Sequence, residues 1–368
     1  MSGKAKKAVS LRVLTVLPPR ESYAEGHAGA IALLVSRLAQ PGDRITGKAI
    51  TDVPLPGGSF VPLAISGWPL PQRLKYDMAC LSEARDFKPD LIEVHNRPDL
   101  ALFLSRFAPV RLILHNDPCS MRGAKTPAQR QRLADRLLVC GVSGWVAERF
   151  SDRCGPLSVA IQPNCITLED IPEVRPRQQA VLFAGRVVAD KGVDAFVRAW
   201  ATIRSRYPGW TAILMGADRF GPDSPETPFL ARLRPEAEKA GVFMTGYQPH
   251  ARILDAMAEA AIVVVPSRWP EPFGMTALEA MACGAAVIVS PVGALPDVVG
   301  SAALLASPDE PGALEGALCH LMDQAALRSE LGQKGRERAA MFGLEQARAQ
   351  LLELRQQAVS FSRGSAVP

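Results

Sequence analysis

The fold is decided by residues 262–290, IVVVPSRWPEPFGMTALEAMACGAAVIVS. The stretch opens with four β-branched residues, a run typical of a strand buried on both faces. Two prolines follow, and they disfavour helical geometry in the residues before them, so Glu271 is expected on a loop. A short helix should then begin near Gly274–Thr276 and end at Gly284, a common helix terminator. Residues 285–290 form a second buried strand.

This order of elements predicts a ligand site. A loop at the carboxyl end of a parallel strand is where open α/β sheets bind ligands. The helix after the loop directs its N–H groups and the positive end of its dipole toward it, which favours a phosphate. Two carboxylates, Glu271 and Glu279, stand on either side of the helix start.

The stretch resembles the nucleotide-sugar signature of GT4-type retaining glycosyltransferases. The similarity rests on EPFG at 271–274, EAMACG at 279–284 and VGALPD at 292–297, and it extends upstream to FAGR at 183–186 and KG at 191–192. It covers most of the C-terminal half. The resemblance implies the α/β architecture called GT-B, in which two Rossmann-like α/β/α domains face each other across a cleft.

Length and element order agree with two domains. The chain has 368 residues, about twice an ordinary domain. Alternating strands and helices favour a parallel sheet in each half. We expect an N-terminal acceptor-side domain at 1–165, a nucleotide-sugar-binding domain at 166–345 and a linker at 163–178. The resemblance implies that the last helix, 346–368, crosses back to the first domain.

The strands can be placed by their apolar runs, and two helix starts by their capping residues. Thr126 and Ser143 are expected to cap helices. Strands are expected at 11–17, 49–53, 62–65, 91–96, 112–116, 138–142, 158–161, 180–184, 211–215, 242–245, 262–265, 286–289 and 302–305.

Composition indicates a soluble protein with reduced thiols. Hydrophobic residues make up 48% and charged residues 21% of the chain, and no apolar run reaches the ~18 residues that a membrane span needs. The seven cysteines are scattered without a Cys-x-x-Cys pair, which argues against disulfides or a zinc site. We therefore expect a cytoplasmic protein.

Positive charge is concentrated in the first half. Residues 1–168 carry a net charge of about +8, although the whole chain carries +5. One interpretation is a solvated helix face; the other is a face that meets an anionic membrane at its inner surface or a phosphorylated acceptor. Nucleic acid is not expected, because aromatic residues are not interleaved with the basic ones. Much of the excess positive charge lies in Arg122, Lys125, Arg130, Arg132 and Arg136.

Arg186 and Lys191 follow an expected strand and are flanked by glycines. They are either two surface cations on a flexible loop or, as the resemblance implies, a pair that holds the donor diphosphate. Fixed cations lower the barrier where a leaving nucleotide gains negative charge. No Asp-x-Asp motif occurs, so we expect no required metal and no cofactor, only a UDP- or GDP-linked sugar as co-substrate.

The two carboxylates have competing interpretations. Glu271 is either a surface acid or, by resemblance, a ligand of the transferred sugar. Glu279 either completes a capping box with Thr276 or binds the ribose hydroxyls. The resemblance adds donor contacts near the helix start and, for the base, after the strand at 242–245; these residues are Phe273, Gly274, Met275, Thr276, Tyr247 and Gln248.

Two expected strands end in His-Asn, at His95 and His115. The family has a histidine near the donor sugar after a comparable strand, which favours His115 as a catalytic residue beside Arg186, Lys191 and Glu271. His95 is the competing candidate and otherwise lies on the acceptor side. Gly29, at the start of the first helix, either admits an acceptor or phosphate closely or serves packing alone.

The sequence therefore indicates a glycosyltransferase that moves a sugar from a nucleotide-diphosphate sugar to a hydroxyl acceptor with retention of anomeric configuration. Family breadth favours an acceptor in cell-envelope polysaccharide or lipopolysaccharide. The alternatives are a nucleotide-sugar epimerase of the same fold, which needs no acceptor, and a catalytically silent nucleotide-sugar-binding subunit.

Overall fold

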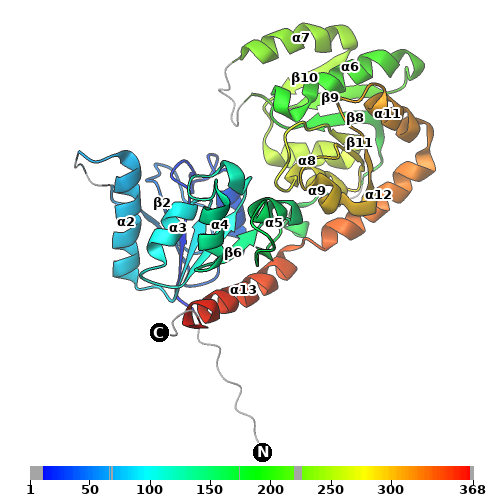
Figure 1. Ribbon diagram of the computed structural model, residues 1–368. Helices are drawn as coiled ribbons and strands as arrows, with labels where there is room; N and C mark the ends of the chain where they lie inside the picture. Colours follow the sequence, from blue (N-terminus) through cyan, green and yellow to red (C-terminus); the bar gives the residue numbers. More distant parts are fainter. Residues whose placement is uncertain (1–10, 66, 68, 174, 219–225, 365–368) are drawn as a thin grey trace, which may run out of the picture. The chain divides into compact units, whose positions relative to one another are not determined.

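A computed structural model describes residues 11–65, 67, 69–173, 175–218 and 226–364 (Figure 1). The first ten residues of the predicted N-terminal domain and Val174 of the predicted linker lie outside this part. The chain divides into two compact units, one formed by 1–163 with 347–368 and one by 164–346. The boundaries expected from the sequence lie within two residues of these.

The N-terminal unit contains a parallel sheet of seven strands in the order β3-β2-β1-β4-β5-β6-β7. Its central strands are fully buried, as their apolar runs predict. The strands are β1 (Val13–Val16), β2 (Arg44–Gly47), β3 (Ser59–Pro62), β4 (Leu91–His95), β5 (Val110–Leu114), β6 (Leu138–Gly141) and β7 (Ala160–Ile161). The helices are α1 (Ala30–Leu38), α2 (Gln72–Phe87), α3 (Pro98–Leu104), α4 (Pro127–Ala134) and α5 (Gly144–Ser151).

The prediction of a strand at 49–53 is wrong. The second strand lies earlier, at Arg44–Gly47, where Ile45 and Thr46 are buried. Residues 51–54 lie in an exposed loop with one isolated bridge between Ala24 and Pro54. Burial, which the apolar character of a five-residue run cannot report, decides which segment joins the sheet.

The last helix, α13 (Leu344–Gly364), adds its residues from Ala347 onward to the N-terminal unit. Its buried positions follow a helical repeat, and Arg355 lies within that buried stripe. The guanidinium of Arg355 donates to the carboxylates of Asp43 and Glu93. These bonds attach the end of the chain to segments that lie about three hundred residues earlier in sequence.

The C-terminal unit contains a parallel sheet of six strands in the order β10-β9-β8-β11-β12-β13. Helices pack on both of its faces (Figure 1). The strands are β8 (Gln178–Ala184), β9 (Thr211–Met215), β10 (Val242–Gly246), β11 (Ala260–Val265), β12 (Ala286–Val289) and β13 (Ala303–Leu305). The helices are α6 (Val193–Ile203), α7 (Pro228–Ala240), α8 (His250–Glu259), α9 (Met275–Ala282), α10 (Leu295–Val299), α11 (Ala313–Asp323) and α12 (Ala325–Ala340).

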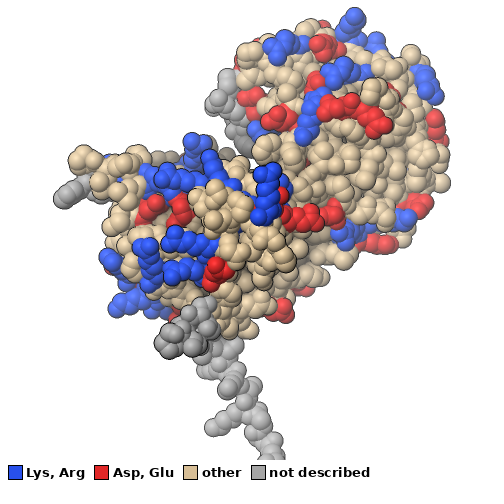
Figure 2. Space-filling view, in the orientation of Figure 1, with Lys and Arg blue, Asp and Glu red and all other residues tan. Residues whose placement is uncertain are grey.

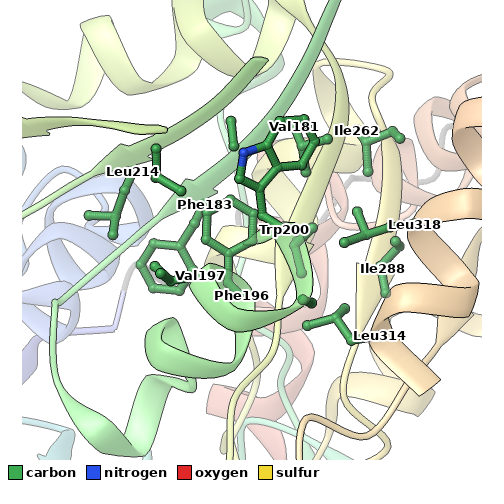
Figure 3. Packing of buried hydrophobic residues seen from close by; sticks show 14 of the residues in the cluster. Val181, Phe183, Phe196, Val197, Trp200, Leu214, Ile262, Ile288, Leu314 and Leu318 are labelled. Atoms are coloured by element: carbon green, nitrogen blue, oxygen red, sulfur yellow. The ribbon is translucent and has the colours of Figure 1, made fainter. Parts of the chain in front are cut away.

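The core of the C-terminal unit forms between β8, β11 and helix α6 (Figure 3). Val181 and Phe183 are alternate residues of β8, so both point to the same face. They meet Phe196 and Trp200, which are one helical turn apart on α6. Each large apolar side chain buried in this way contributes roughly 1.5–3 kcal/mol. The core fixes the sheet whose carboxyl edge carries the loops described next.

Candidate functional site

Helix α9 begins at the carboxyl end of β11, as the sequence predicts. Its N-cap is Gly274, in left-handed geometry with φ 101°, and no side chain caps the helix. A Cβ atom at Gly274 would lie 2.5 Å from Leu295 Cδ2, so glycine is required here. Because Thr276 lies inside the first turn, the capping-box interpretation of Thr276 and Glu279 is wrong.

Glu279 instead contacts a histidine. Its Oε1 lies 2.9 Å from Nε2 of His250, the first residue of α8. The Glu279 side chain is 14% exposed and that of His250 is 52% exposed, so both are accessible to a ligand. The pair brings the start of α8 beside the first turns of α9. His250 was not among the candidates; a histidine at a helix start after a strand of the same sheet was the available signal.

Glu271 lies at the centre of a polar cluster. Its Oε1 accepts hydrogen bonds from Lys191 Nζ at 2.5 Å and from Ser267 Oγ at 2.6 Å. The Glu271 side chain is 11% and the Lys191 side chain 23% exposed, so neither is a plain surface charge. The interpretation of Lys191 as a cation on an exposed loop is therefore wrong. Ser267, also missed, ends the apolar run of β11, and that position was its signal.

The loop that carries Lys191 is held close to β11 by a glycine. Gly192 has φ 67°, and a Cβ atom there would lie 1.8 Å from the carbonyl oxygen of Pro266. Only a residue without a side chain allows this approach. Lys191 thereby reaches Glu271, although the two residues are eighty positions apart. Arg186, five residues earlier, is exposed.

The other donor-site candidates differ in what they can offer. Phe273 is buried and packs edge-to-face against Phe342, with ring centroids 5.6 Å apart, so only its backbone is available. Met275 and Thr276 are the first two residues of α9. Tyr247 is 38% exposed, and Gln248 donates to the carbonyl oxygen of Thr245.

His95 and His115 lie side by side in the N-terminal unit. Nδ1 of His95 is 2.8 Å from Nε2 of His115, and the rings are stacked with centroids 5.0 Å apart. The backbone N–H of His115 donates to Asn96 Oδ1, and Asn96 itself has φ 54°. Burial lowers the pKa of His115 well below its usual value, and the adjacent His95 lowers it further.

Gly29 is the N-cap of helix α1 and lies beside the carboxylate of Glu21. A Cβ atom at Gly29 would lie 2.4 Å from Oε1 of Glu21, and the same oxygen accepts the backbone N–H of Ala32 in the first turn of α1. A carboxylate thus already occupies this helix start. A phosphate bound there would meet this negative charge. Whether Gly29 contacts an acceptor or phosphate, or serves packing alone, stays a prediction.

The basic residues of the N-terminal unit differ in their exposure to solvent. Figure 2 shows Lys and Arg side chains gathered on its visible face. Arg130, however, is 1% exposed and donates to the carbonyl oxygens of Ala124, Lys125, Phe150 and Asp152. Its assignment to a charged surface is wrong, because these four carbonyls at chain turns need a buried donor. The exposed residues are Arg122, Lys125, Arg132 and Arg136.

The described residues contain neither a membrane-spanning helix nor a group of metal ligands. Within the described ranges, no helix combines the length and apolar character needed to cross a membrane. In the same part of the chain, no three His, Cys, Asp or Glu side chains are grouped so that they could hold a metal ion.

This chain is similar to a known protein family and to curated sequences. Residues 167–338 match the family described as glycosyl transferases group 1. A D-inositol 3-phosphate glycosyltransferase of Acidothermus cellulolyticus is 35% identical over 157 residues, which are 41% of this chain and 35% of that relative. The chain thus spans about a third of the relative's length.

Solved structures match nearly the whole chain. Sucrose-phosphate synthase from Thermosynechococcus elongatus has a TM-score of 0.74 at 21% identity, covering 95% of this chain and 100% of that one. The Anabaena protein HepE in complex with UDP-glucose has a TM-score of 0.73 at 19% identity, with the same coverage of both chains. At these identities the likeness concerns the fold, and it confirms the predicted GT-B fold class.

Proposed function

We propose that this protein transfers a sugar from a nucleotide-diphosphate sugar to a hydroxyl acceptor, because residues 167–338 match the glycosyl transferases group 1 family. The observation that carries the proposal is the cluster of Lys191, Ser267 and Glu271 at the carboxyl end of β11. It places a cation and a carboxylate side by side, beside the N-terminus of α9. The cation can bind a diphosphate, and the carboxylate can accept hydrogen bonds from sugar hydroxyls.

In this proposal each residue has one task. Lys191 and Arg186 meet the negative charge that develops on the leaving diphosphate, helped by the N–H groups of Met275 and Thr276 at the start of α9. Glu271 accepts hydrogen bonds from the transferred sugar. Donor binding therefore draws Lys191 toward phosphate and frees Glu271 for the sugar.

We assign the nucleoside to Glu279 and the loop after β10. Glu279 accepts the ribose hydroxyls, and Tyr247 and Gln248 contact the base. His115 of the N-terminal unit acts in sugar transfer. We propose a UDP-linked donor, supported by the UDP-glucose complex of the HepE structure. Lys191 and Arg186 neutralise the charge of the diphosphate, as a metal ion does in other glycosyltransferases, so no metal is required.

Retention of configuration is part of the proposal. It follows from front-face attack assisted by the leaving phosphate, and the anomeric proton coupling of the product tests it. For the acceptor we propose an envelope glycan, made in the cytoplasm at the inner face of the membrane. Arg122, Lys125, Arg132 and Arg136 are the exposed charges that would contact anionic lipid. The relative's name indicates the competing acceptor class, a phosphorylated polyol.

The deciding experiment is a panel of nucleotide sugars, first by thermal shift and then by turnover with each acceptor class. A bound donor stabilises the protein by RT ln(1 + [L]/Kd). We expect a UDP-sugar to raise the Tm and to be consumed only with acceptor present. Conversion of the donor sugar without acceptor would indicate the epimerase instead. Binding without any turnover would indicate a nucleotide-sugar-binding subunit.

A further inference from the structure

The histidine pair stands at the end of a row of polar side chains inside the N-terminal unit. Thr15, Glu93 and Arg111 are direct cross-strand neighbours on β1, β4 and β5. Strands buried on both faces are normally apolar throughout, so a carboxylate and a guanidinium here need partners. Arg111 Nη2 lies 2.7 Å from Glu93 Oε1, and Arg111 Nη1 donates to Gln162 Oε1 at 2.7 Å.

Helix α13 adds a second cation to this row. Arg355 donates to Glu93 Oε1 at 3.1 Å and to Oε2 at 2.9 Å, and to the two oxygens of Asp43 at 3.2 and 2.7 Å. Side chains of Asp43, Glu93 and Arg355 are all at most 5% exposed. Two guanidiniums thus face two carboxylates in the interior, and the charges balance without a further proton.

His95 lies on the same face of β4 as Glu93, two residues further along. It lines the same small cavity as Glu93, Arg111 and Arg355. Burial lowers the pKa of His95 to about 4; Glu93 opposes this effect, whereas Arg111 and Arg355 add to it. The charged and titratable groups that face His95 are therefore Glu93, Arg111, Arg355, Asp43 behind them and His115.

The hydrogen bond between the two rings limits what His115 can offer. A neutral imidazole has one N–H donor and one acceptor nitrogen. Because Nε2 of His115 is bonded to His95, Nδ1 is the ring nitrogen that remains for a ligand. The proton shared between the rings also decides whether this Nδ1 is a donor or an acceptor.

We propose that His95 is a positioning residue for His115: it fixes the ring so that Nδ1 faces the ligand, and burial beside the Arg111–Glu93–Arg355 network, completed by helix α13, keeps His95 neutral. The proposal rests on the proposed function only for the part that His115 plays in sugar transfer. The pairing and the protonation state can be tested without any enzymatic assay.

The first test is a titration of the histidine rings by ¹H–¹⁵N NMR on the full chain, which has five histidines. His95→Asn and His115→Asn assign the two buried rings. We expect both rings to stay neutral between about pH 5.5 and 8 and one of them to show a hydrogen-bonded acceptor nitrogen. Uptake of a proton by either ring above pH 6, or two rings without a shared hydrogen, would overturn the proposal.

The second test removes the cation of α13. Arg355→Met should raise the pH at which His95 takes up a proton, because a nearby positive charge is lost while Glu93 remains. Arg348→Met is the matched control: Arg348 lies on the same helix, is exposed and donates to the carbonyl oxygen of Arg37. An unchanged titration in a folded Arg355→Met variant contradicts the network's role. If that variant does not fold, Arg355→Lys, which keeps the charge, should leave the titration as in the parent.

The third test measures turnover. His95→Leu replaces the imidazole by an apolar side chain of similar size, and His95→Asn keeps a hydrogen-bonding group near the position of Nδ1. We expect His95→Leu to lower kcat roughly 10²-fold, the cost of a displaced catalytic group, with the donor KM nearly unchanged. His95→Asn should retain most of the parent's kcat. Equal losses in both variants would mean packing alone. If the parent protein transfers no sugar, the proposed function fails, while the NMR titration still decides the pairing.

Discussion

Removal of Lys191 should destabilise the protein in a way that a second substitution repairs. In the cluster at the end of β11, the Glu271 carboxylate accepts from both Lys191 and Ser267 through one oxygen, Oε1. Lys191→Ala leaves this mostly buried carboxylate with Ser267 alone. Glu271→Gln instead keeps an oxygen for Ser267 and leaves an ammonium group that water can reach.

The magnitudes follow from this asymmetry. A hydrogen bond to a charged group contributes about 1.5–3 kcal/mol. Since the Lys191 side chain is 23% exposed, water replaces part of the bond, and we expect Lys191→Ala to cost about 1–2 kcal/mol. Glu271→Gln should cost less than about 1 kcal/mol. The double variant should be more stable than Lys191→Ala, because no unpaired carboxylate remains buried, with a coupling of about 1 kcal/mol.

The assay is urea unfolding followed by the fluorescence of Trp200 and Trp210, which are buried in the same unit, paired with turnover. Lys334→Ala is the control, because its ion pair with Glu330 is similarly short at 2.7 Å but exposed and should contribute about 0.3–0.5 kcal/mol. Turnover should fall roughly 10²–10³-fold in Lys191→Ala, and Glu271→Gln should not restore it. A double variant as unstable as the sum of the singles would refute this reasoning.

Three further outcomes are expected. Glu279→Gln should weaken binding of a nucleoside diphosphate by about 1–3 kcal/mol in isothermal titration, with the Tm of the free protein nearly unchanged; unaltered affinity would remove Glu279 from the ribose site. His115→Ala should lower turnover strongly and leave that affinity intact, and loss of nucleotide binding would contradict its role. Burial raises the pKa of Glu93, but its two arginine partners outweigh burial and hold the pKa below its usual range. The ionised Glu93 therefore contributes fully to stability above about pH 4.3, and this contribution is lost as the pH falls. Glu93→Gln should lower the free energy of unfolding, measured in urea, at pH 7 and lower it much less at pH 3. An equal loss at both pH values would show that the contribution of Glu93 does not come from its charge.

Local features of this protein were readable from the sequence. Thr126 and Ser143 cap helices as predicted: Thr126 forms a capping box with Gln129, and Ser143 accepts from the N–H of Val146. The strand, loop and helix at 262–282 lie where the apolar run, the prolines and the glycines predict them. These signals depend on residues within four positions of one another, so they do not depend on the tertiary structure.

Predictions failed where burial or a distant partner decides. Arg130 resembles any basic residue of a polar helix, yet carbonyl oxygens from three other turns surround it. The Thr276–Glu279 spacing fits a capping box, but a left-handed Gly274 starts the helix two residues too early for it. In both cases the local pattern was compatible with two states, and packing selected one.

The sequence by itself determined the alternation of strands and helices and the spaced motifs of the C-terminal half, because period and spacing are properties of the chain. Only the tertiary structure decided which charges meet. Lys191 reaches Glu271 because parallel strands end at one edge of a sheet, and His95 reaches His115 for the same reason. Arg355 reaches Glu93 across 262 positions because a helix must bury its apolar stripe, and the arginine within that stripe is buried with it.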